Sequence, residues 1–341
     1  MSEDYLWDPS APVDPEVQRL EHLLGRLRSV PPAPSLPERV RWSSRLGRPA
    51  ALLAAAAAVL LVVAIGWRGV HAPERMSPWQ VTSLEGRPRV GLAAVVPETR
   101  FAVGQTLVTD SVSRARISAE AVGQIVVDPD SRVRLIATRD GHHRLALDRG
   151  TLHAFIVAPP GQFQIDTRSA TAVDLGCAYT LHMADDGNGL LSVEAGWVGF
   201  EWHGRESFVP AGASCRTSPI SGPGSPRYDD AGNDFKEALD EVDAAPASPG
   251  RERAFRLVLQ RARRRDAVTL WHLLSRVQPS ERDEVFKALA ALVPPPAGVT
   301  HDLVARLDRT ALDPWWDALG LGDASFWRRW ERPLPSGPAP R

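Results

Sequence analysis

The longest apolar stretch of the chain is residues 49–67, PAALLAAAAAVLLVVAIGW, which carries no charge and lies between Arg48 and Arg68. At 1.5 Å per residue, a helix of this length reaches roughly 28 Å, close to the hydrocarbon thickness of a bilayer. A buried helix of a soluble protein would need a large surrounding core, which the preceding residues do not offer. A cleaved signal peptide would need a much shorter leader. The stretch therefore predicts one transmembrane helix.

The charges on either side of this stretch predict its orientation. Four arginines precede it within 37–48 against one glutamate, whereas residues 68–79 contain two arginines and one glutamate. The positive-inside rule then places residues 1–48 in the cytoplasm. With only two lysines and abundant Arg, Ala, Pro and Gly, the composition is typical of high-GC bacterial coding. We expect a single-pass protein of a bacterial inner (cytoplasmic) membrane, with extracytoplasmic, periplasmic C-terminal domains.

A helical pattern also occurs in the predicted cytoplasmic segment, 1–48. Asp14, Pro15 and Glu16 have the order of an N-cap, a first helical position and an acidic first turn, and the helix should run to about Arg28. One short helix cannot bury an apolar face by itself in water, so either it meets a partner, a second copy or the membrane surface, or it is loosely ordered and has no role. The candidate partner-binding residues are Trp7, Val17, Leu20, Leu24 and Leu27, with Leu23 on the same face. A proline-rich linker, residues 31–37, follows.

The pattern changes to short alternating runs between residues 78 and 217. Residues 144–147 and 163–166 are examples, and glycine recurs between such runs. Turns are expected at Asp140-Gly141 and at residues 185–189. Short strands separated by Gly, Asp and Pro turns predict an all-β domain, either a sandwich or a short β-solenoid.

Helical periodicity returns near the C-terminus. Residues 218–250 are rich in Ser, Gly and Pro and predict mostly a linker, with a short helix around residues 234–242. Residues 251–331 predict a small α-helical domain, a bundle or a HEAT-like stack, that ends in an aromatic cluster. The tail, 332–341, should be disordered. The predicted helices are 251–265, 266–276, 280–292, 300–308 and 313–319.

Composition and motifs give no support for catalysis. The net charge of −1 points to neither nucleic acid nor acidic ligands. His142 and His143 follow a predicted turn and should be solvated, and no histidine spacing resembles a metal site. No glycine-rich loop precedes a helix, and the run 263–265 of three arginines should lie on a solvated helix face. We therefore expect no enzyme, no metal, no cofactor and no direct nucleic-acid contact.

The two cysteines, Cys177 and Cys215, both fall on the predicted outer side of the membrane. A disulfide could persist there and would stabilise the fold by roughly 3–4 kcal/mol. Two buried free thiols are the alternative. Asp174 lies near Cys177, but no basic residue is close enough in sequence to lower the pKa of the thiol, so a catalytic cysteine is not favoured.

An ordered series of short motifs in the predicted β domain resembles the FecR-type domain. Each motif is weak alone, but nine occur in the same order as in the family. They are the segments 104–110, 113–117, 123–127, 131–135, 147–152, 163–167, 173–176, 193–198 and 209–212. Glycines in these motifs suit tight turns between strands.

The resemblance implies an extracytoplasmic β domain on a single-pass protein that senses an outside event, with an N-terminal segment similar to an anti-sigma region. The implied cytoplasmic partner is an extracytoplasmic-function sigma factor, and the outer partner is an unknown envelope protein or ligand. Two features depart from the family: the cytoplasmic segment is shorter than the usual anti-sigma domain, and helices replace the usual receptor-contacting module. A non-enzymatic envelope scaffold or binding protein without transcriptional output is the alternative.

Overall fold

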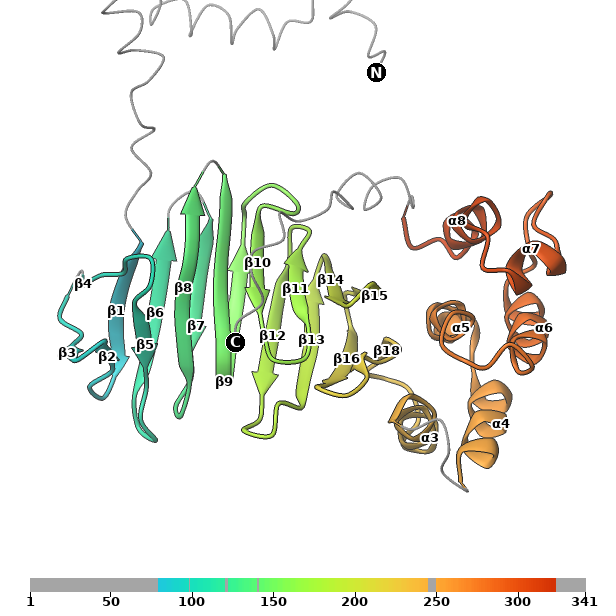
Figure 1. The fold of residues 1–341 in the computed structure, drawn as a ribbon, viewed down its shortest axis with the longest axis horizontal. Coiled ribbons are helices and arrows are strands. Elements are labelled where there is room, and N and C mark those ends of the chain that lie inside the picture. Colours follow the sequence, from blue (N-terminus) through green and yellow to red (C-terminus); the bar gives the residue numbers. More distant parts are fainter. Residues whose placement is uncertain (1–78, 98, 120–121, 140, 245–249, 323–341) are drawn as a thin grey trace, which may run out of the picture. The chain divides into compact units, whose positions relative to one another are not determined.

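The computed structural model describes residues 79–97, 99–119, 122–139, 141–244 and 250–322, all within one compact unit, Pro73–Arg341. No helix in these ranges is long and apolar enough to cross a membrane. The predicted span 49–67, the cytoplasmic helix and the tail lie outside the described residues. The described part is a large β domain followed by a few helices (Figure 1).

Two facing sheets form the β domain. One sheet has the order β1-β6-β7-β9-β12-β13-β16, with β4 beside β1 and the short β17 and β18 beside β16. The other has the order β3-β2-β5-β8-β9-β10-β11-β14-β15. The strands are β1 Gln80–Glu85, β2 Arg89–Val90, β3 Ala93–Ala94, β4 Thr99–Arg100, β5 Thr106–Val108, β6 Arg114–Ala119, β7 Gly123–Val127, β8 Arg132–Arg139, β9 His142–Ile156, β10 Phe163–Asp166, β11 Thr171–Asp174, β12 Ala178–Met183, β13 Gly189–Ala195, β14 Trp197–Trp202, β15 Arg205–Pro210, β16 Ala213–Ser218, β17 Gly222–Pro223 and β18 Arg227–Tyr228.

Alternation along each strand explains the core between the sheets. In β6, Ala115 and Ile117 are fully buried while Arg116 between them is exposed, as expected when successive side chains point to opposite faces. The other sheet contributes residues such as Leu107 and Leu145 to the same core. The predicted all-β domain is therefore confirmed, and of the two predicted arrangements the sandwich describes it.

One solenoid-like feature remains within this sandwich. The long strand β9 belongs to both sheets, because its first half pairs with β8 and its second half with β7 and β12. The chain then returns so that β10 runs parallel to the first half of β9, with Phe163 beside His143. All other strand pairs among the described residues are antiparallel.

Gly150 allows β9 to pass from one sheet to the other. Its φ is +91°, and a Cβ added there would lie 2.1 Å from Ser131 Oγ and 2.4 Å from Ser131 Cα. Ser131 Oγ accepts the N–H of Thr151 at 2.9 Å, so the serine closes the same corner by a hydrogen bond. The corner needs glycine because both the backbone conformation and the close contact exclude a side chain.

Gly150→Ala is expected to lower the free energy of unfolding by at least about 2 kcal/mol more than Gly104→Ala. Gly104 has a similar φ of +87° but nothing within 4 Å of an added Cβ, so the difference isolates the steric contact at Ser131. Urea unfolding of the two variants measures it. Equal losses would show that the corner can accommodate a methyl group.

The helices after the sandwich are α3 Asn233–Ala244, α4 Arg251–Arg261, α5 Ala267–Leu273, α6 Arg282–Leu292, α7 His301–Ala305 and α8 Arg309–Ala318. They match the predicted helices closely, including the short one around 234–242. They have their own apolar core, which includes Phe235, Phe255 and Trp315.

The segment 218–250, predicted as mostly linker, differs from that expectation. It contains β17, β18 and α3, and residues 222–228 are all buried. The small and proline residues of 222–226 are buried in the fold instead of separating two domains. Likewise, Val268 and Trp316 from the helices belong to the core cluster of the sandwich, so the helices are not an independent bundle or stack.

Candidate functional site

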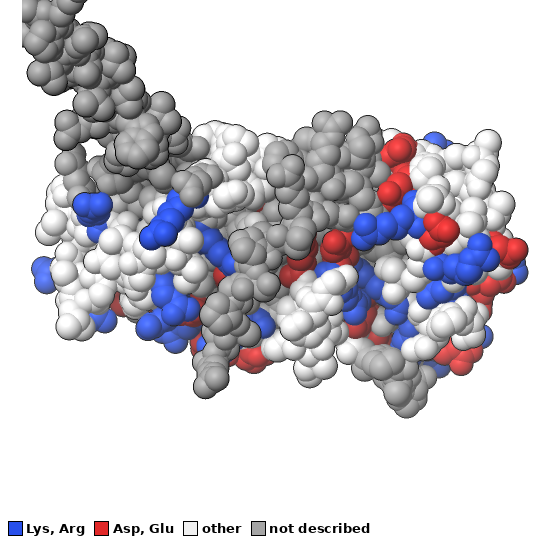
Figure 2. Space-filling view, turned by 45° about the horizontal axis from the view of Figure 1, so that its top comes forward, with Lys and Arg blue, Asp and Glu red and all other residues white. Residues whose placement is uncertain are grey.

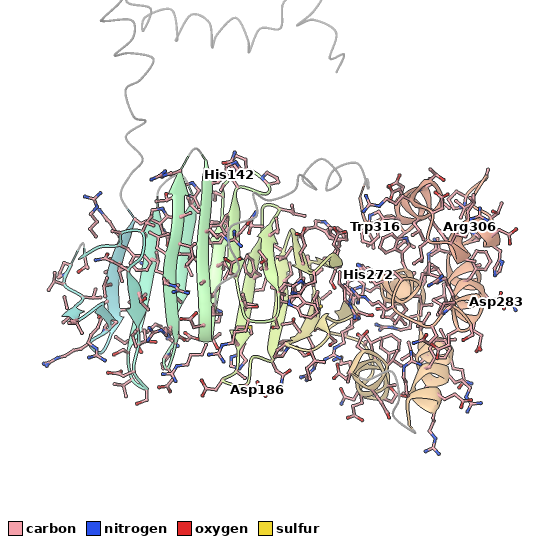
Figure 3. All side chains as sticks on the ribbon, in the orientation of Figure 1. His142, Asp186, His272, Asp283, Arg306 and Trp316 are labelled. Atoms are coloured by element: carbon pink, nitrogen blue, oxygen red, sulfur yellow. The ribbon has the colours of Figure 1, made fainter. Side chains whose placement is uncertain are left out.

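The outer edge of β15 is where the helices meet the sandwich. β15 is the last strand of its sheet, and β14 pairs with it on one side only. On the other side, the N–H of Phe208 donates a hydrogen bond to His272 Nε2 at 3.1 Å. His272 Nδ1–H donates in turn to Val268 O at 2.8 Å within α5, which fixes the neutral tautomer. His272 lies on the side of the helices that faces the sandwich (Figure 3).

Burial sets the protonation state of His272. The side chain is only 2% exposed, and this burial, together with the nearby Arg276 charge, lowers the pKa of His272 to about 3. The imidazole is therefore neutral at physiological pH and can accept the Phe208 N–H. If the ring were protonated, His272 Nε2–H would face the Phe208 N–H, and the hydrogen bond would be lost.

Arg276 makes the second contact with this edge, one turn after His272. Its Nη2 donates to Glu206 O at 2.8 Å and to Ser207 Oγ at 2.6 Å, and its Nη1 donates to Ser225 Oγ at 2.8 Å. Burial, with Arg205 nearby, lowers the pKa of Arg276 to about 10, so the guanidinium remains charged at neutral pH. His272 and Arg276 thus satisfy a backbone donor and a backbone acceptor of β15.

We call the contacts of His272 and Arg276 with β15 the β15 junction. Asp243 on α3 supplies a negative charge near the arginines of this junction. It accepts the N–H of Ser225 at 2.6 Å and the hydroxyl of Ser225 at 3.1 Å, and it lies 3.7 Å from Arg205 Nη2. Within the described residues, the Nε atoms of Arg205 and Arg276 are shielded from solvent without a hydrogen-bond partner. The junction is therefore polar, buried and incompletely satisfied.

Aromatic rings surround the polar contacts. Trp316 of α8 lies with its ring centroid 4.9 Å from that of Trp271, 5.9 Å from Trp197 and 6.0 Å from Phe208. Trp271 Nε1 donates to Leu312 O at 3.1 Å, which ties α5 to α8. These contacts join β14, β15, α5 and α8 into one packed region.

The arginine run 263–265 is exposed, as the sequence predicted, but it follows the end of α4 at Arg261 instead of lying along a long helix. Arg263 pairs with Asp266 at 2.7 Å and with Asp230 at 3.0 Å, and Arg265 pairs with Asp230 at 2.7 Å. Arg265 also stacks over the ring of Tyr228, 3.9 Å from its centroid. The run follows α4 and contacts β18 and the turn after it. Oppositely charged side chains are interspersed over the helical part in Figure 2.

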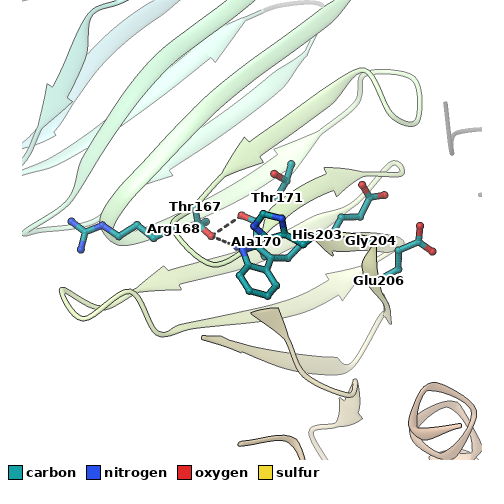
Figure 4. A pocket seen from close by; sticks show the side chains of 9 residues that line it. Thr167, Arg168, Ala170, Thr171, His203, Gly204 and Glu206 are labelled. Atoms are coloured by element: carbon teal, nitrogen blue, oxygen red, sulfur yellow. Dashed lines mark hydrogen bonds between the residues drawn. The ribbon is translucent and has the colours of Figure 1, made fainter. Parts of the chain in front are cut away.

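A pocket of about 270 Å³ lies at the turn of the β14–β15 hairpin (Figure 4). Glu201 and Glu206 face each other directly across the hairpin, an arrangement in which like charges repel. The rings of Trp202 and His203 pack edge to face, with their centroids 4.4 Å apart. The pocket is lined by Thr167, Arg168, Ala170, Thr171, Glu201, Trp202, His203, Gly204 and Glu206. Glu206 lines the pocket while its carbonyl binds Arg276, so pocket and junction share one strand.

The two cysteines are buried free thiols and do not form the disulfide that the sequence left open. Cys177 Sγ donates to Asp174 Oδ2 at 2.5 Å, and Cys215 Sγ donates to Gly224 O at 3.1 Å. Burial, followed by the negative charge of Asp174, raises the pKa of Cys177 far above its usual range. The thiol is protonated at neutral pH, as expected of a non-catalytic cysteine.

Asp174 is the buried carboxyl beside this thiol. It is 1% exposed and also accepts the N–H of Gly176 at 2.7 Å. Burial raises its pKa to about 6, although the bonds from Cys177 and Gly176 act in the opposite direction. Tyr179 lies within reach of the Asp174 charge, and its buried hydroxyl has no partner in the described part of the chain.

Of the two histidines predicted to be solvated, one is exposed and the other is buried. His142 is exposed, but His143 is 5% exposed and contacts Thr138 Oγ1 at 3.0 Å, with its ring 5.8 Å from that of Trp79. Burial lowers the pKa of His143. Within the described ranges, no group of His, Cys, Asp and Glu could hold a metal ion.

The candidate partner-binding residues of the predicted cytoplasmic segment, Trp7, Val17, Leu20, Leu24 and Leu27, lie outside the described residues.

Sequence reasoning did not find the contacts that His272 and Arg276 make with β15. His272 and Arg276 occur four positions apart, a spacing that predicts one shared helix face. The spacing does not predict that this face contacts a strand.

Part of the β sandwich matches a known protein family. Residues 105–199, from the start of β5 into β14, match the family model of FecR protein. The chain contains a FecR domain. At the level of the family, this match supports a regulator of a sigma factor. The β14–β15 hairpin and the helices begin at the end of the matched FecR domain.

Comparison with solved structures gives a weaker likeness. Two crystal structures of a candidate anti-sigma factor from Parabacteroides distasonis, at 1.65 and 2.50 Å resolution, are each 12% identical, with a TM-score of 0.32. The match covers 40% of this chain and 64% of that one, so less than two thirds of the other chain is spanned. No curated protein matches the sequence.

Proposed function

We propose that this protein is a single-pass inner-membrane regulator that binds an extracytoplasmic-function sigma factor through its cytoplasmic segment and responds to an envelope event through its outer FecR domain. The match of residues 105–199 to the FecR family carries this proposal. The apolar stretch 49–67 with its flanking arginines supports the membrane topology.

The cytoplasmic contact is assigned to the predicted helix from Pro15 to Arg28. Its apolar face, with Leu20 and Leu24 near the centre, has no partner in its own short segment and needs one to be buried. Binding at this face would keep the sigma factor from RNA polymerase until the outer domain responds. The protein acts by binding, with no catalytic step of its own.

Pull-down from bacterial lysate with residues 1–48 as bait tests the proposal. We expect the unaltered bait to recover a sigma factor, and a bait with Leu20→Asp and Leu24→Asp to recover less than a tenth as much, because two charges cannot be buried in an apolar contact. Mass spectrometry of the captured proteins measures both results.

Gln18→Asp with His22→Asp is the matched control, since it places two charges at the same spacing on the opposite side of the predicted helix. This bait should still recover the sigma factor. If no bait recovers a sigma factor, the regulator proposal is wrong and the envelope scaffold becomes the better description. If both doubly charged baits lose it equally, the contact is not made by the apolar face.

A further inference from the structure

An uncharged hairpin lies at the end of the sandwich that is farthest from the helices (Figure 1). It joins β2 to β3 and continues to Pro97, so that residues 90–97 read VGLAAVVP. Gly91, with a φ of +62°, takes the first position of a two-residue turn and leaves Leu92 at its tip. Leu92 is 99% exposed and Val96 is 61% exposed. Folding therefore leaves an apolar hairpin in contact with solvent.

Backbone N–H groups of this hairpin are bonded within the domain. Gly91 N–H donates to Thr106 O at 2.8 Å, and Val96 N–H donates to Thr99 Oγ1 at 2.8 Å. The strand β3 contains only two residues, which leaves little edge for a further strand to pair with. A hairpin of this kind offers its apolar side chains more than its backbone, and it can enter the interface of a bilayer, where unpaired backbone groups are costly.

Arginines lie on both sides of the apolar run. Arg87 and Arg89 precede it and Arg100 follows it, so this stretch carries three arginines against one glutamate, Glu98. Among the described residues, no carboxylate lies within ion-pairing distance of these three arginines, although Asp110 is within electrostatic reach of Arg89. Blue side chains outnumber red ones at this end of the sandwich in Figure 2. The hairpin is therefore apolar at its tip and basic at its base.

The hairpin also lies beside the first strand of the domain. Thr99 Oγ1 donates to Val96 O at 2.8 Å, and β4, which begins at Thr99, pairs with the start of β1. Phe101 N–H, directly after β4, donates to Trp79 O at 2.7 Å. Val96 and Trp79 therefore belong to one hydrogen-bonded corner of the domain.

The chain that leads to this corner is short. Residues 68–78 connect the apolar stretch 49–67 to Trp79. Fully extended, a connection of this length spans at most about 40 Å. On the membrane topology proposed above, on which this inference rests, the corner and its hairpin are confined near the bilayer surface.

We propose that the hairpin docks on the anionic lipid surface of the membrane that carries the protein. Leu92 and Val96 enter the boundary between headgroups and acyl chains, while Arg87, Arg89 and Arg100 bind lipid phosphates beside them. Buried apolar area and electrostatic attraction to anionic lipids together determine the strength of such binding. A contact this small is weak from free solution, but the short connection makes it intramolecular and raises the effective concentration of the surface.

A protein is the other occupant that an apolar surface can have. The hairpin has none of the aromatic side chains that dominate protein interfaces, since its exposed members are Leu, Ala, Val and Pro. Its arginines complement lipid phosphates, and its short connection keeps it near them. Lipid is therefore the better match, and a bound protein is one outcome of the test.

The test uses the full-length chain in vesicles of phosphatidylcholine with about 30% phosphatidylglycerol as the anionic lipid. A polarity-sensitive dye is attached at Ala94→Cys in the hairpin or, as the control, at Ile220→Cys in the turn between β16 and β17. Both native cysteines are buried, so the dye reacts with the introduced thiol. We expect spin-labelled lipid to quench the dye at position 94 at least about threefold more strongly than the dye at position 220.

Leu92→Asp and Ile220→Asp form a matched pair, because these turn residues are 99% and 89% exposed and neither change disturbs the core. Leu92→Asp should abolish the additional quenching at position 94, since a charge cannot enter the acyl region without a large cost. Ile220→Asp should leave that quenching unchanged.

A second pair of variants tests the charge. Arg89→Gln/Arg100→Gln should reduce the quenching at position 94 to the level found in vesicles of phosphatidylcholine alone, because attraction to the anionic surface is lost. Arg253→Gln/Arg256→Gln removes the same charge from exposed positions of α4 and should have no effect.

Two results would overturn the docking alone. Equal quenching at positions 94 and 220 in a chain that resists carbonate extraction shows that the hairpin remains in water, and it leaves the regulator proposal intact. A dye at position 94 that is shielded from water but not quenched by lipid shows that a protein, such as a second copy, covers the hairpin. Carbonate extraction of the chain from the vesicles is a different failure: residues 49–67 then do not span the bilayer, and the proposed topology falls together with the docking.

Discussion

Replacing Arg276 by alanine is expected to lower the free energy of unfolding by about 3–5 kcal/mol, because hydrogen bonds from a buried charged group contribute about 1.5–3 kcal/mol each and several are lost together. The guanidinium donates three hydrogen bonds, to Glu206 O, Ser207 Oγ and Ser225 Oγ. Alanine leaves these acceptors without their donor and leaves Asp243 with less compensating charge in a shielded position. The cavity left by the side chain adds to the loss.

Urea unfolding followed by tryptophan fluorescence measures this change, since Trp197, Trp271 and Trp316 surround the junction. Arg276→Lys should retain part of the stability, because an ammonium keeps the charge but cannot reproduce the three-way geometry of the guanidinium. Arg256→Ala is the control: its pair with Glu252 is exposed, so its loss should stay within about 0.5 kcal/mol. Equal losses for Arg276→Ala and Arg256→Ala would contradict a structural role for the junction.

Acidification is expected to weaken the same junction through His272. Its pKa is about 3 in the folded protein and 6.5 when unperturbed, so the unfolded chain binds the proton first. The stability that neutral His272 contributes is complete above pH 6.5 and is lost as the pH falls toward 3. A difference of this size corresponds to about 5 kcal/mol over the whole interval.

Asp174 acts in the opposite direction over an overlapping range. Its pKa is raised from 3.8 to about 6, so the folded state binds the proton first. The stability gained from protonated Asp174 is present below pH 3.8 and is lost as the pH rises through 6, by about 3 kcal/mol in total. Between pH 6 and 4 the contributions of His272 and Asp174 largely cancel.

Urea unfolding at pH 7, 5 and 4 separates the two groups. Asp174→Asn removes the compensating gain, so this variant should lose several kcal/mol on acidification from pH 7 to 4, whereas the wild type should change much less. His272→Leu should instead become more stable over that range. Parallel curves for the wild type and both variants would show that neither buried group titrates as its surroundings require.

Local chemistry accounts for the parts of the fold that sequence predicted well. Alternation in segments such as 144–147 and 163–166 gave strands, because one side of each strand faces an apolar core. Periodicity after residue 251 gave helices close to their observed bounds. Ordered glycine and turn motifs indicated the FecR domain, because a corner such as Gly150 admits only glycine.

Errors occurred where a residue's role depends on what lies opposite it. The segment 218–250 has the composition of a linker, yet residues 222–226 within it are buried beside β16 and α3. Arg263 and Arg265 are exposed, as predicted, but the sequence did not indicate that they pair with Asp230 or that Arg265 lies over the ring of Tyr228. His143 follows a turn, as expected, but its strand buries it.

The sequence by itself determined the order of most elements, the all-β character of residues 78–217, their FecR motifs and the prediction of a membrane-spanning stretch. These follow from local periodicity and backbone preference, which each segment carries independently. Only the tertiary structure decided that the helices cover the edge of β15, with His272 on Phe208 and Arg276 on Glu206. That contact joins residues more than sixty positions apart. The groups that β15 contributes are a backbone N–H and a backbone C=O, which almost every residue carries, so no side-chain pattern in β15 reveals the contact.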